Sequence, residues 1–452
     1  MSAAMNRIHL KIPAACHTYS KGDDQFPATA PRIIERGEGY TLWDDKGRPF
    51  IDWTMGLASV SLGHAYPPVV QAAKAWLERG SNFARPTGLE EELADHFLAV
   101  VPCAQMVKFG KHGSDGTSSA VRLARAFTGR DRVFACSCNP FYSVHDWWIG
   151  ATETPAGIPE SIRSLTHTFA FGDLAVLDAL LDRYGREVAC IIVEPAGTTP
   201  PALQGGCARC AGPEQVTRPT CPQEMFWKQV QERARSVGAL FVLDENKTGF
   251  QLDLPGAETF YGLQPDMVCF GKAIANGFSV SALAGRADVL DQGGIYQTER
   301  DRVFLLSATH GGETHALAAA IRTMEIMRSE PVIEHKWRIG RALAHQFNAA
   351  AAQARVANHI ALQGYSCFPA LCIERNGVPD VSFRTLFLQE MASRGVIFNF
   401  IVPSYSHDER AVKETIAAAE GALAVCAEAL AANAVEERLL GPVIRPVFRR
   451  RN

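Results

Sequence analysis

The sequence predicts an α/β protein: a large domain with a mixed, mostly parallel sheet between helices, and a smaller α+β domain. Two observations predict this fold. Short apolar runs alternate with helical segments through the middle of the chain, and after about Ser329 the sequence becomes Ala-rich and helical, broken by a strand-like stretch near residues 365–375. Strands that alternate with helices form parallel sheets. We expect the large domain over residues 76–329 and the small domain over 330–452, with an N-terminal segment 1–75 packing against the small domain.

Three apolar runs predict strands of the large sheet. VACIIVEP (188–195) and ALFVLDEN (239–246) are rich in β-branched and aromatic residues and end abruptly in polar ones, whereas MFWKQVQERARSVG (225–238) between them has helical spacing. A strand, a helix and a second strand in this order form a parallel pair. DMVCFGK (266–272) predicts a third strand.

Each of these strands ends in a residue that can carry chemistry: Glu194, Asp244 and Lys272. Open α/β sheets bind ligands beyond the carboxyl ends of their strands. Lys272 is unusual because it begins a nearly uncharged stretch, KAIANGFSVSALAG. An unpaired ammonium is costly to bury unless it loses its proton or reacts. We therefore expect Lys272 either to reach solvent or to act as a neutral amine.

A second candidate site precedes the predicted helix SSAVRLARAFTG (118–129), where KHGSDG (111–116) supplies small and polar residues. Free backbone N–H groups and the helix dipole suit such a turn to an anion, and the hydroxyls of Ser114 and Thr117 could add donors. The alternative is an ordinary capped helix start.

Composition excludes several classes of protein. The chain has 452 residues, 47% of them apolar and 21% charged, with a formal net charge of −3. These values are ordinary for a soluble enzyme of two or three domains, and they give no sign of nucleic-acid or membrane binding. The N-terminus shows no apolar core of signal-peptide length, and we expect the protein to be cytoplasmic.

The twelve cysteines mostly lie in apolar surroundings, which is typical of reduced, buried thiols. Cys207, Cys210 and Cys221 are the exception, because they lie in a Gly/Pro-rich stretch. Three cysteines are three parts of a zinc site, but no fourth ligand is near in sequence. An ordinary loop insertion is the preferred interpretation, a metal site or disulfide the alternative, and no metal is predicted.

A strand-end aspartate, a lysine after a nearby strand and a phosphate-type helix start together indicate pyridoxal phosphate (PLP) chemistry. A neutral lysine attacks the cofactor aldehyde, and the resulting Schiff base exchanges with substrate amines. Asp244 would pair with the pyridinium nitrogen, so that the ring accepts carbanion electrons. Taken singly, Lys272 could be a surface lysine and Asp244 a helix cap; the combination favours the cofactor.

Stretches along most of the chain resemble class III aminotransferases of PLP fold type I, especially the branch around glutamate semialdehyde aminomutase. The stretches that carry the resemblance are GYTLWDDKGRPFIDWTMGLASVSLGHAYPPV, FARPTGLEEELA, KFGKHGSDGTSSAVRLARAFTGRD, IIVEPAG, FVLDENKTGFQLDLPGAETFYGLQPDMVCFGKAIANGFSVSALAG and SATHGGETHALAAA.

The resemblance implies roles for individual residues. Lys272 is then the Schiff-base lysine and the proton shuttle, Asp244 the ring-nitrogen partner, and Glu194 a residue near the ring hydroxyl. Gly113 and Ser114 match the phosphate turn. A further implication concerns Thr309, which matches a threonine that reaches the cofactor phosphate of a neighbouring subunit and so implies a homodimer with shared active sites.

The sequence departs from the family pattern at several positions. The ring-stacking loop is CNPFYSVHDWW, so the stacking residue is Phe141 or Tyr142, of which Phe141 is favoured. The motif DENKTGF places Asn246 and Lys247 where relatives vary. Lys247 could be mistaken for a second catalytic amine, but we expect an exposed or ion-paired lysine.

The substrate prediction depends on YSKGDDQFPATAP, which has Asp23 and Asp24 and no arginine. An acidic pair repels an acid and attracts an amine. We therefore predict transfer of an amino group, from glutamate or another amino acid, to a carbonyl of a sugar or aminocyclitol such as an aminoglycoside precursor. A solvated acidic loop is the alternative for these aspartates.

Two other activities remain open. An aminomutase or epimerase begins with the same proton abstraction by Lys272. A non-catalytic protein of the same fold is a minor alternative, because fold alone does not establish function.

Overall fold

The computed structural model describes residues 8–139, 141–196, 222–296 and 298–451, so Cys207, Cys210 and Cys221 lie outside the described residues. The chain forms two compact units: Met1–Leu57 with Lys336–Asn452, and Ala58–His335. The divisions expected from the sequence followed residues 75 and 329 instead. The first difference arises because α3 (Pro67–Leu77) packs against α13 (Thr314–Ser329), which places the chain after Leu57 in the second unit.

The second unit is built on a seven-stranded sheet in the order β4-β10-β9-β8-β7-β5-β6. Strands β9, β8, β7, β5 and β6 run parallel, whereas β10 is antiparallel to both β9 and β4. The strands are β4 (Met106–Gly110), β5 (Arg132–Cys136), β6 (Thr166–Phe169), β7 (Val188–Val193), β8 (Leu240–Asp244), β9 (Met267–Phe270) and β10 (Ser281–Gly285). The predicted mixed, mostly parallel sheet is confirmed.

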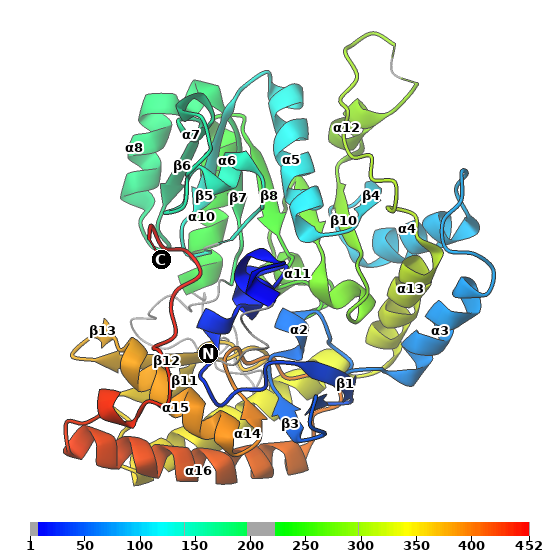
Figure 1. The fold of residues 1–452 in the computed structure, drawn as a ribbon. Coiled ribbons are helices and arrows are strands. Elements are labelled where there is room, and N and C mark those ends of the chain that lie inside the picture. Colours follow the sequence, from blue (N-terminus) through cyan, green and yellow to red (C-terminus); the bar gives the residue numbers. More distant parts are fainter. Residues whose placement is uncertain (1–7, 140, 197–221, 297, 452) are drawn as a thin grey trace. The chain divides into compact units, whose positions relative to one another are not determined.

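The central strands are uniformly apolar because they are covered on both faces. Every residue of β7, β8, β9 and β10 is buried, as expected for parallel strands with helices packed on them. Helix α5 (Gly113–Thr128) contacts β7, β9 and β10, and α10 (Pro222–Ser236) contacts β8 (Figure 1). Burial on both faces makes these strands recognisable in the sequence.

The remaining helices of this unit are short or peripheral. They are α2 (Met55–Ala58), which spans the unit division, α4 (Gly88–Val100), α6 (Asp146–Ile149), α7 (Glu160–Arg163), α8 (Leu174–Tyr184), α11 (Ala257–Tyr261) and α12 (Ala287–Leu290), with 3-10 turns η4 (Gly185–Glu187), η5 (Lys272–Ala275) and η6 (Asp291–Gly293).

The first unit contains two small sheets. One has the order β1-β2-β3-β14 and the other β11-β12-β13. Their strands are β1 (Ile34–Glu38), β2 (Thr41–Asp44), β3 (Pro49–Asp52), β11 (Ile360–Gln363), β12 (Ala370–Arg375), β13 (Val378–Pro379) and β14 (Val396–Ile397). The stretch expected near residues 365–375 contains β12.

Three helices and four 3-10 turns of the described residues complete the first unit. The helices are α14 (Val332–Gln353, in this unit from Lys336), α15 (Val381–Ser393) and α16 (Glu409–Ala431), and the turns are η1 (Pro13–Ala15), η2 (Tyr19–Lys21), η3 (Asp23–Gln25) and η7 (Glu436–Arg438). Its core includes Trp53, which stacks on His407 at 4.1 Å between ring centroids and donates a hydrogen bond from Nε1 to Thr415 Oγ1 at 2.8 Å. Among the described residues, no helix is long and apolar enough to cross a membrane.

Candidate active site

The carboxyl ends of β7, β8 and β9 bring three predicted residues to one edge of the sheet. Val193 lies opposite Leu243, so the next residues, Glu194 and Asp244, follow neighbouring strands at the same level. Asp244 in turn pairs with Cys269, three residues before Lys272. The exposed fractions of Glu194 and Asp244 are only 4% and 2%.

Lys272 lies in the turn that follows β9. It is exposed and begins η5, with a backbone φ of +43°. This left-handed conformation is uncommon for a residue with a side chain and is typical of functional turns. The Lys272 ammonium lowers the pKa of both Asp244 and Glu194, so its charge lies near both carboxyls. The structure therefore brings the three predicted residues together.

Asp244 is a buried carboxylate with two donors on one oxygen. The backbone N–H and the side-chain Nδ2 of Asn246 both donate to Asp244 Oδ1, at 2.9 and 2.7 Å. Burial raises the pKa of Asp244 to about 6, and Lys272 and the Asn246 donors act in the opposite direction. At neutral pH the carboxylate is mostly ionised, which is the state that pairs with a cationic ring nitrogen.

Glu194 lies beside this pair and is only partly satisfied. Its Oε1 is buried and has no hydrogen-bond partner among the described residues, and burial raises its pKa to about 7. The charge of Lys247, a residue that is only 4% exposed, is the strongest influence that lowers the pKa of Glu194. Lys247 is therefore buried near a carboxyl, so the exposed alternative of the prediction is wrong and the ion-paired alternative remains.

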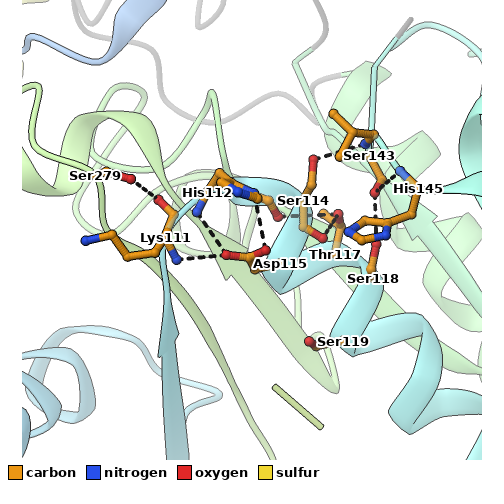
Figure 2. Close-up of polar contacts among 12 residues, drawn as sticks. Lys111, His112, Ser114, Asp115, Thr117, Ser118, Ser119, Ser143, His145 and Ser279 are labelled. Atoms are coloured by element: carbon orange, nitrogen blue, oxygen red, sulfur yellow. Dashed lines mark hydrogen bonds and ion pairs between the residues drawn. The ribbon is translucent and has the colours of Figure 1, made fainter. Parts of the chain in front are cut away.

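The N-terminus of α5 is a compact polar turn (Figure 2). Asp115 Oδ2 accepts the backbone N–H groups of Lys111 and His112, at 2.8 and 3.1 Å, and so caps the helix. The helix begins at Gly113, five residues before the predicted start, because these capping contacts order the polar stretch. First-turn N–H groups of a helix lack intrahelical acceptors and suit a phosphate.

Hydroxyl groups of α5 tie this turn to the loop that carries the predicted stacking residue. Ser114 Oγ accepts the Val144 N–H at 3.1 Å, and the Thr117 hydroxyl donates to the Tyr142 carbonyl at 2.8 Å. Ser114 still has a hydroxyl proton to donate, whereas Thr117 has donated its own to the loop. The hydroxyl that we expected Thr117 to add to the anion site is therefore used in positioning the loop.

The two candidate stacking residues have different surroundings. Tyr142 is 1% exposed; its hydroxyl donates to the Cys136 carbonyl at 3.0 Å and accepts the Glu194 N–H at 3.1 Å. Phe141 is 43% exposed. The Tyr142 ring is thus part of the core and links the loop to β7, which leaves Phe141 as the ring available to a ligand.

Two glycines let the phosphate turn and the lysine turn approach the Asp244 strand end. A Cβ on Gly113 would lie 2.3 Å from Asn246 Oδ1, and one on Gly271 would lie 2.5 Å from the same atom. Both distances are far below a van der Waals contact. Only glycine fits at either position while Asn246 keeps its place.

Three predicted residues, Thr309, Asp23 and Asp24, have printed contacts with residues outside this cluster. Thr309 is exposed, and its carbonyl accepts from Asn82 Nδ2 at 3.2 Å. In the first unit, Asp23 pairs with His9 Nε2 at 2.9 Å and Asp24 with Arg449 Nη2 at 2.7 Å. The negative charge on which the substrate prediction depended is therefore partly neutralised within the first unit.

The sequence prediction gave no role to Asn246. The motif DENKTGF places Asn246 only where relatives vary, and nothing in the sequence shows that its side chain contacts both glycine turns. A polar side chain two residues after the aspartate that ends a buried strand is the signal that could have identified it.

These residues suit PLP by their chemistry. A helix start with small residues suits a phosphate, a buried carboxylate suits a ring cation, and an accessible amine beside it suits an aldehyde. The unpartnered buried oxygen of Glu194 offers a further acceptor to a bound molecule. The fold and the site together define a PLP-dependent enzyme of fold type I.

Comparison with known proteins agrees. The family model described as aminotransferase class-III matches residues 20–401. The chain is 32% identical over 418 residues to the glutamate-1-semialdehyde 2,1-aminomutase of Roseiflexus castenholzii, covering 87% of this chain and 90% of the relative. It is 30% identical over 420 residues to glutamate-1-semialdehyde 2,1-aminomutase 2 of Bacillus thuringiensis, covering 87% and 91%.

Solved structures share the fold. The FumI protein of Sphingopyxis sp. MTA144, in its PLP internal aldimine form, superposes with a TM-score of 0.80 at 24% identity, covering 94% of this chain and 96% of that one. An omega-transaminase of Sphaerobacter thermophilus gives a TM-score of 0.79 at 21% identity, covering 94% and 98%. The chain belongs to the class III aminotransferases, and its cofactor is PLP.

A pair of buried carboxyls, Glu245 and Glu258, follows the strand end at Asp244. Glu245 accepts the Glu258 N–H at 2.9 Å and a hydrogen bond from the Thr248 hydroxyl. Glu258 is 3% exposed, and its Oε2 has no partner among the described residues. Burial raises the pKa of each carboxyl to about 7. Both groups are therefore largely neutral in the folded protein below that pH.

We predict that Glu258→Gln makes stability less dependent on pH. The pKa of Glu258 in the folded protein, about 7, lies above its ordinary value of 4.5. The contribution of the protonated carboxyl to the free energy of unfolding is therefore complete below pH 4.5 and is lost as pH rises through 7. The variant should match the wild type at pH 4.5 and exceed it at pH 8 by up to about 3 kcal/mol in free energy of unfolding. Urea unfolding at both pH values measures this; the exposed Glu91→Gln serves as control, and an equal pH dependence in wild type and variant contradicts it.

Proposed function

We propose that the chain transfers an amino group from an amino acid, glutamate, to a carbonyl of a sugar or aminocyclitol. The observation that carries the amino-transfer part is the convergence of Lys272, Asp244 and Glu194, since the lysine charge lowers the pKa of both buried carboxyls. An accessible amine held beside a buried carboxylate at the ends of adjacent strands is the arrangement that this chemistry needs.

When bound, PLP supplies an aldehyde that condenses with amines and a ring that accepts carbanion electrons. In our proposal Lys272 provides the amine that holds the cofactor and then carries the proton to and from the substrate carbon. Asp244, with one oxygen saturated by Asn246, keeps the proton on the ring nitrogen. Gly113 and Ser114 hold the phosphate at the start of α5, and Phe141 covers one face of the ring.

The proposal assigns Glu194 to the ring hydroxyl and Thr309 to the phosphate held by a second copy of the chain. Thr309 is exposed, as a residue that reaches across a subunit interface must be in the single chain. The enzyme would then be a homodimer whose two active sites each need both subunits.

Borohydride reduction identifies the amine that holds the cofactor. It converts the carbon–nitrogen double bond between lysine and PLP into a stable single bond, so peptide mass spectrometry finds the labelled residue. We expect the label on Lys272 and none on Lys247, because Lys272 is exposed whereas Lys247 is buried. Lys272→Ala should abolish labelling, with the surface Lys413→Ala as control. A label on Lys247 would show that the roles are reversed.

Adding L-glutamate alone tests the donor half of the reaction. The visible absorption of the bound cofactor should be lost, and 2-oxoglutarate should appear in an amount equal to the active sites, because the amino group stays on the enzyme until an acceptor arrives. A band that glutamate leaves unchanged, with no keto acid formed, would exclude glutamate as the donor.

The choice of a cationic sugar as the acceptor depends on the negative charge of Asp23 and Asp24. Their pairing with His9 and Arg449 leaves a weaker negative field than two free carboxylates would produce. If they attract a cationic amino sugar, Asp23→Asn with Asp24→Asn should raise KM for that acceptor about 5-fold, which corresponds to about 1 kcal/mol, while kcat and the KM for glutamate stay unchanged. A KM for the acceptor that does not rise would contradict the electrostatic part of the proposal.

A second candidate function is an aminomutase, which moves an amino group within one substrate. The observation that favours it is the sequence identity of 32% and 30% to two glutamate-1-semialdehyde aminomutases, over most of this chain and of each relative. An aminomutase turns over a single substrate without releasing a keto acid from a separate donor. Product analysis with glutamate-1-semialdehyde as the sole substrate distinguishes the two functions.

A further inference from the structure

Asn246 contacts all three segments to which the proposed function assigns the cofactor. Its backbone N–H and its Nδ2 donate to Asp244 Oδ1. On its other side, Asn246 Oδ1 lies where a Cβ of Gly113 or of Gly271 would come within 2.3 or 2.5 Å. The side chain, 8% exposed, thus fills the space between the phosphate turn, the lysine turn and the strand-end aspartate.

The orientation of the Asn246 amide is determined by its neighbours. A carboxylate only accepts hydrogen bonds, so the NH2 group must face Asp244 and the carbonyl oxygen must face the two glycines. Rotating the amide by half a turn would place an oxygen against the carboxylate and lose a buried, charge-assisted hydrogen bond. The close approach of Gly113 and Gly271 also leaves the side chain little room to take another rotamer.

The two donors from Asn246 leave the Asp244 carboxylate asymmetric. Oδ1 accepts both of them, whereas no hydrogen bond from the described residues is directed at Oδ2. A carboxylate held in this way offers one oxygen, in one direction, to a further donor. If the backbone N–H were the only donor to Oδ1, the carboxylate could rotate about its Cβ–Cγ bond and share its charge between directions.

We propose that Asn246 is a positioning residue that aims the free oxygen of Asp244 at the ring nitrogen of PLP. This inference rests on the proposed role of Asp244 as the partner of that nitrogen. Asn246 acts through Asp244, and the two glycines are required because they admit the amide. Asn246 therefore determines how much the ring nitrogen contributes to the affinity for PLP, and has little effect on the affinity that the other parts of the cofactor provide.

A cofactor analogue without the ring nitrogen separates positioning from general structure. In 1-deazapyridoxal 5′-phosphate, a C–H group replaces the nitrogen, while the aldehyde and phosphate remain. We would measure the dissociation constants of PLP and of this analogue for wild type, Asp244→Asn, Asn246→Leu and Asn246→Ala. Each protein is first freed of cofactor and checked to be folded. Gln251→Leu is the matched control, because it also removes a buried amide in the same unit.

We expect wild type and Gln251→Leu to bind PLP at least 10-fold more tightly than the analogue, since a charge-assisted hydrogen bond is involved. Asp244→Asn should lose this preference. Asn246→Leu, which keeps the branched shape, should weaken PLP binding about 10-fold and analogue binding less than 2-fold. Asn246→Ala should show the same loss of preference, and it serves if the leucine variant does not fold.

The outcomes separate the two proposals. A wild type with no preference for PLP, or an Asp244→Asn variant that keeps the preference, would refute the role of Asp244 and the inference with it. If Asp244→Asn loses the preference while both Asn246 variants keep it, Asp244 retains its role and the inference about Asn246 is wrong. Equal weakening of both ligands by the Asn246 variants would likewise show a structural role only.

Discussion

Burial of the Asp244 carboxylate beside the Lys272 amine is the constraint on which the rest of the site depends. A carboxylate with 2% exposure is stable only if its charge is compensated by hydrogen bonds and a nearby cation. The Asn246 donors and the Lys272 charge provide this compensation. Both come from short turns after parallel strands, so the sheet must keep β8 and β9 in register for the carboxylate to remain ionised.

The same constraint explains the contacts around the phosphate turn. Because Asn246 occupies the space beside Gly113 and Gly271, the start of α5 and the turn before Lys272 approach the end of β8 closely. Thr117 then fixes the next loop through the Tyr142 carbonyl, and the Tyr142 hydroxyl accepts the backbone N–H of Glu194. A continuous set of hydrogen bonds thus links the proposed phosphate site to the carboxyls. Local changes in this set are transmitted because each buried donor has a specific acceptor.

The central fold could be predicted from the sequence for a physical reason. Strands such as β7 and β8 are buried on both faces, so they appear as continuous apolar runs, and the polar residue that ends each run marks the ligand edge. Lys272 and Asp244 were identifiable on the same ground. The start of α5 was predicted too late, because a turn of glycine, serine and aspartate has low helix propensity and forms helix here through the Asp115 cap.

Other features could not be predicted because they arise from contacts between distant segments. Asn246 meets Gly113 across more than a hundred residues, and Asp24 meets Arg449 across most of the chain. Lys247 is polar and follows a strand end, which in sequence indicates solvent exposure, yet it is buried near Glu194. Spacing identifies which residues share an element, but a buried ion or a glycine contact depends on which elements meet.

The carboxyls around Asp244 show how a crowded acidic site avoids self-repulsion. Glu194, Glu245 and Glu258 are all buried, and burial raises the pKa of each to about 7. Burial raises the pKa of Asp244 from a lower ordinary value, 3.8, to about 6, and Lys272 and the two Asn246 donors oppose this increase. The negative charge of Asp244 opposes ionisation of Glu194 and Glu245, and so raises the pKa of both. Donors also oppose the effect of burial at Glu245, which accepts from the Thr248 hydroxyl and the Glu258 N–H. The Asn246 donors are therefore one of several contributions that favour the negative charge on Asp244.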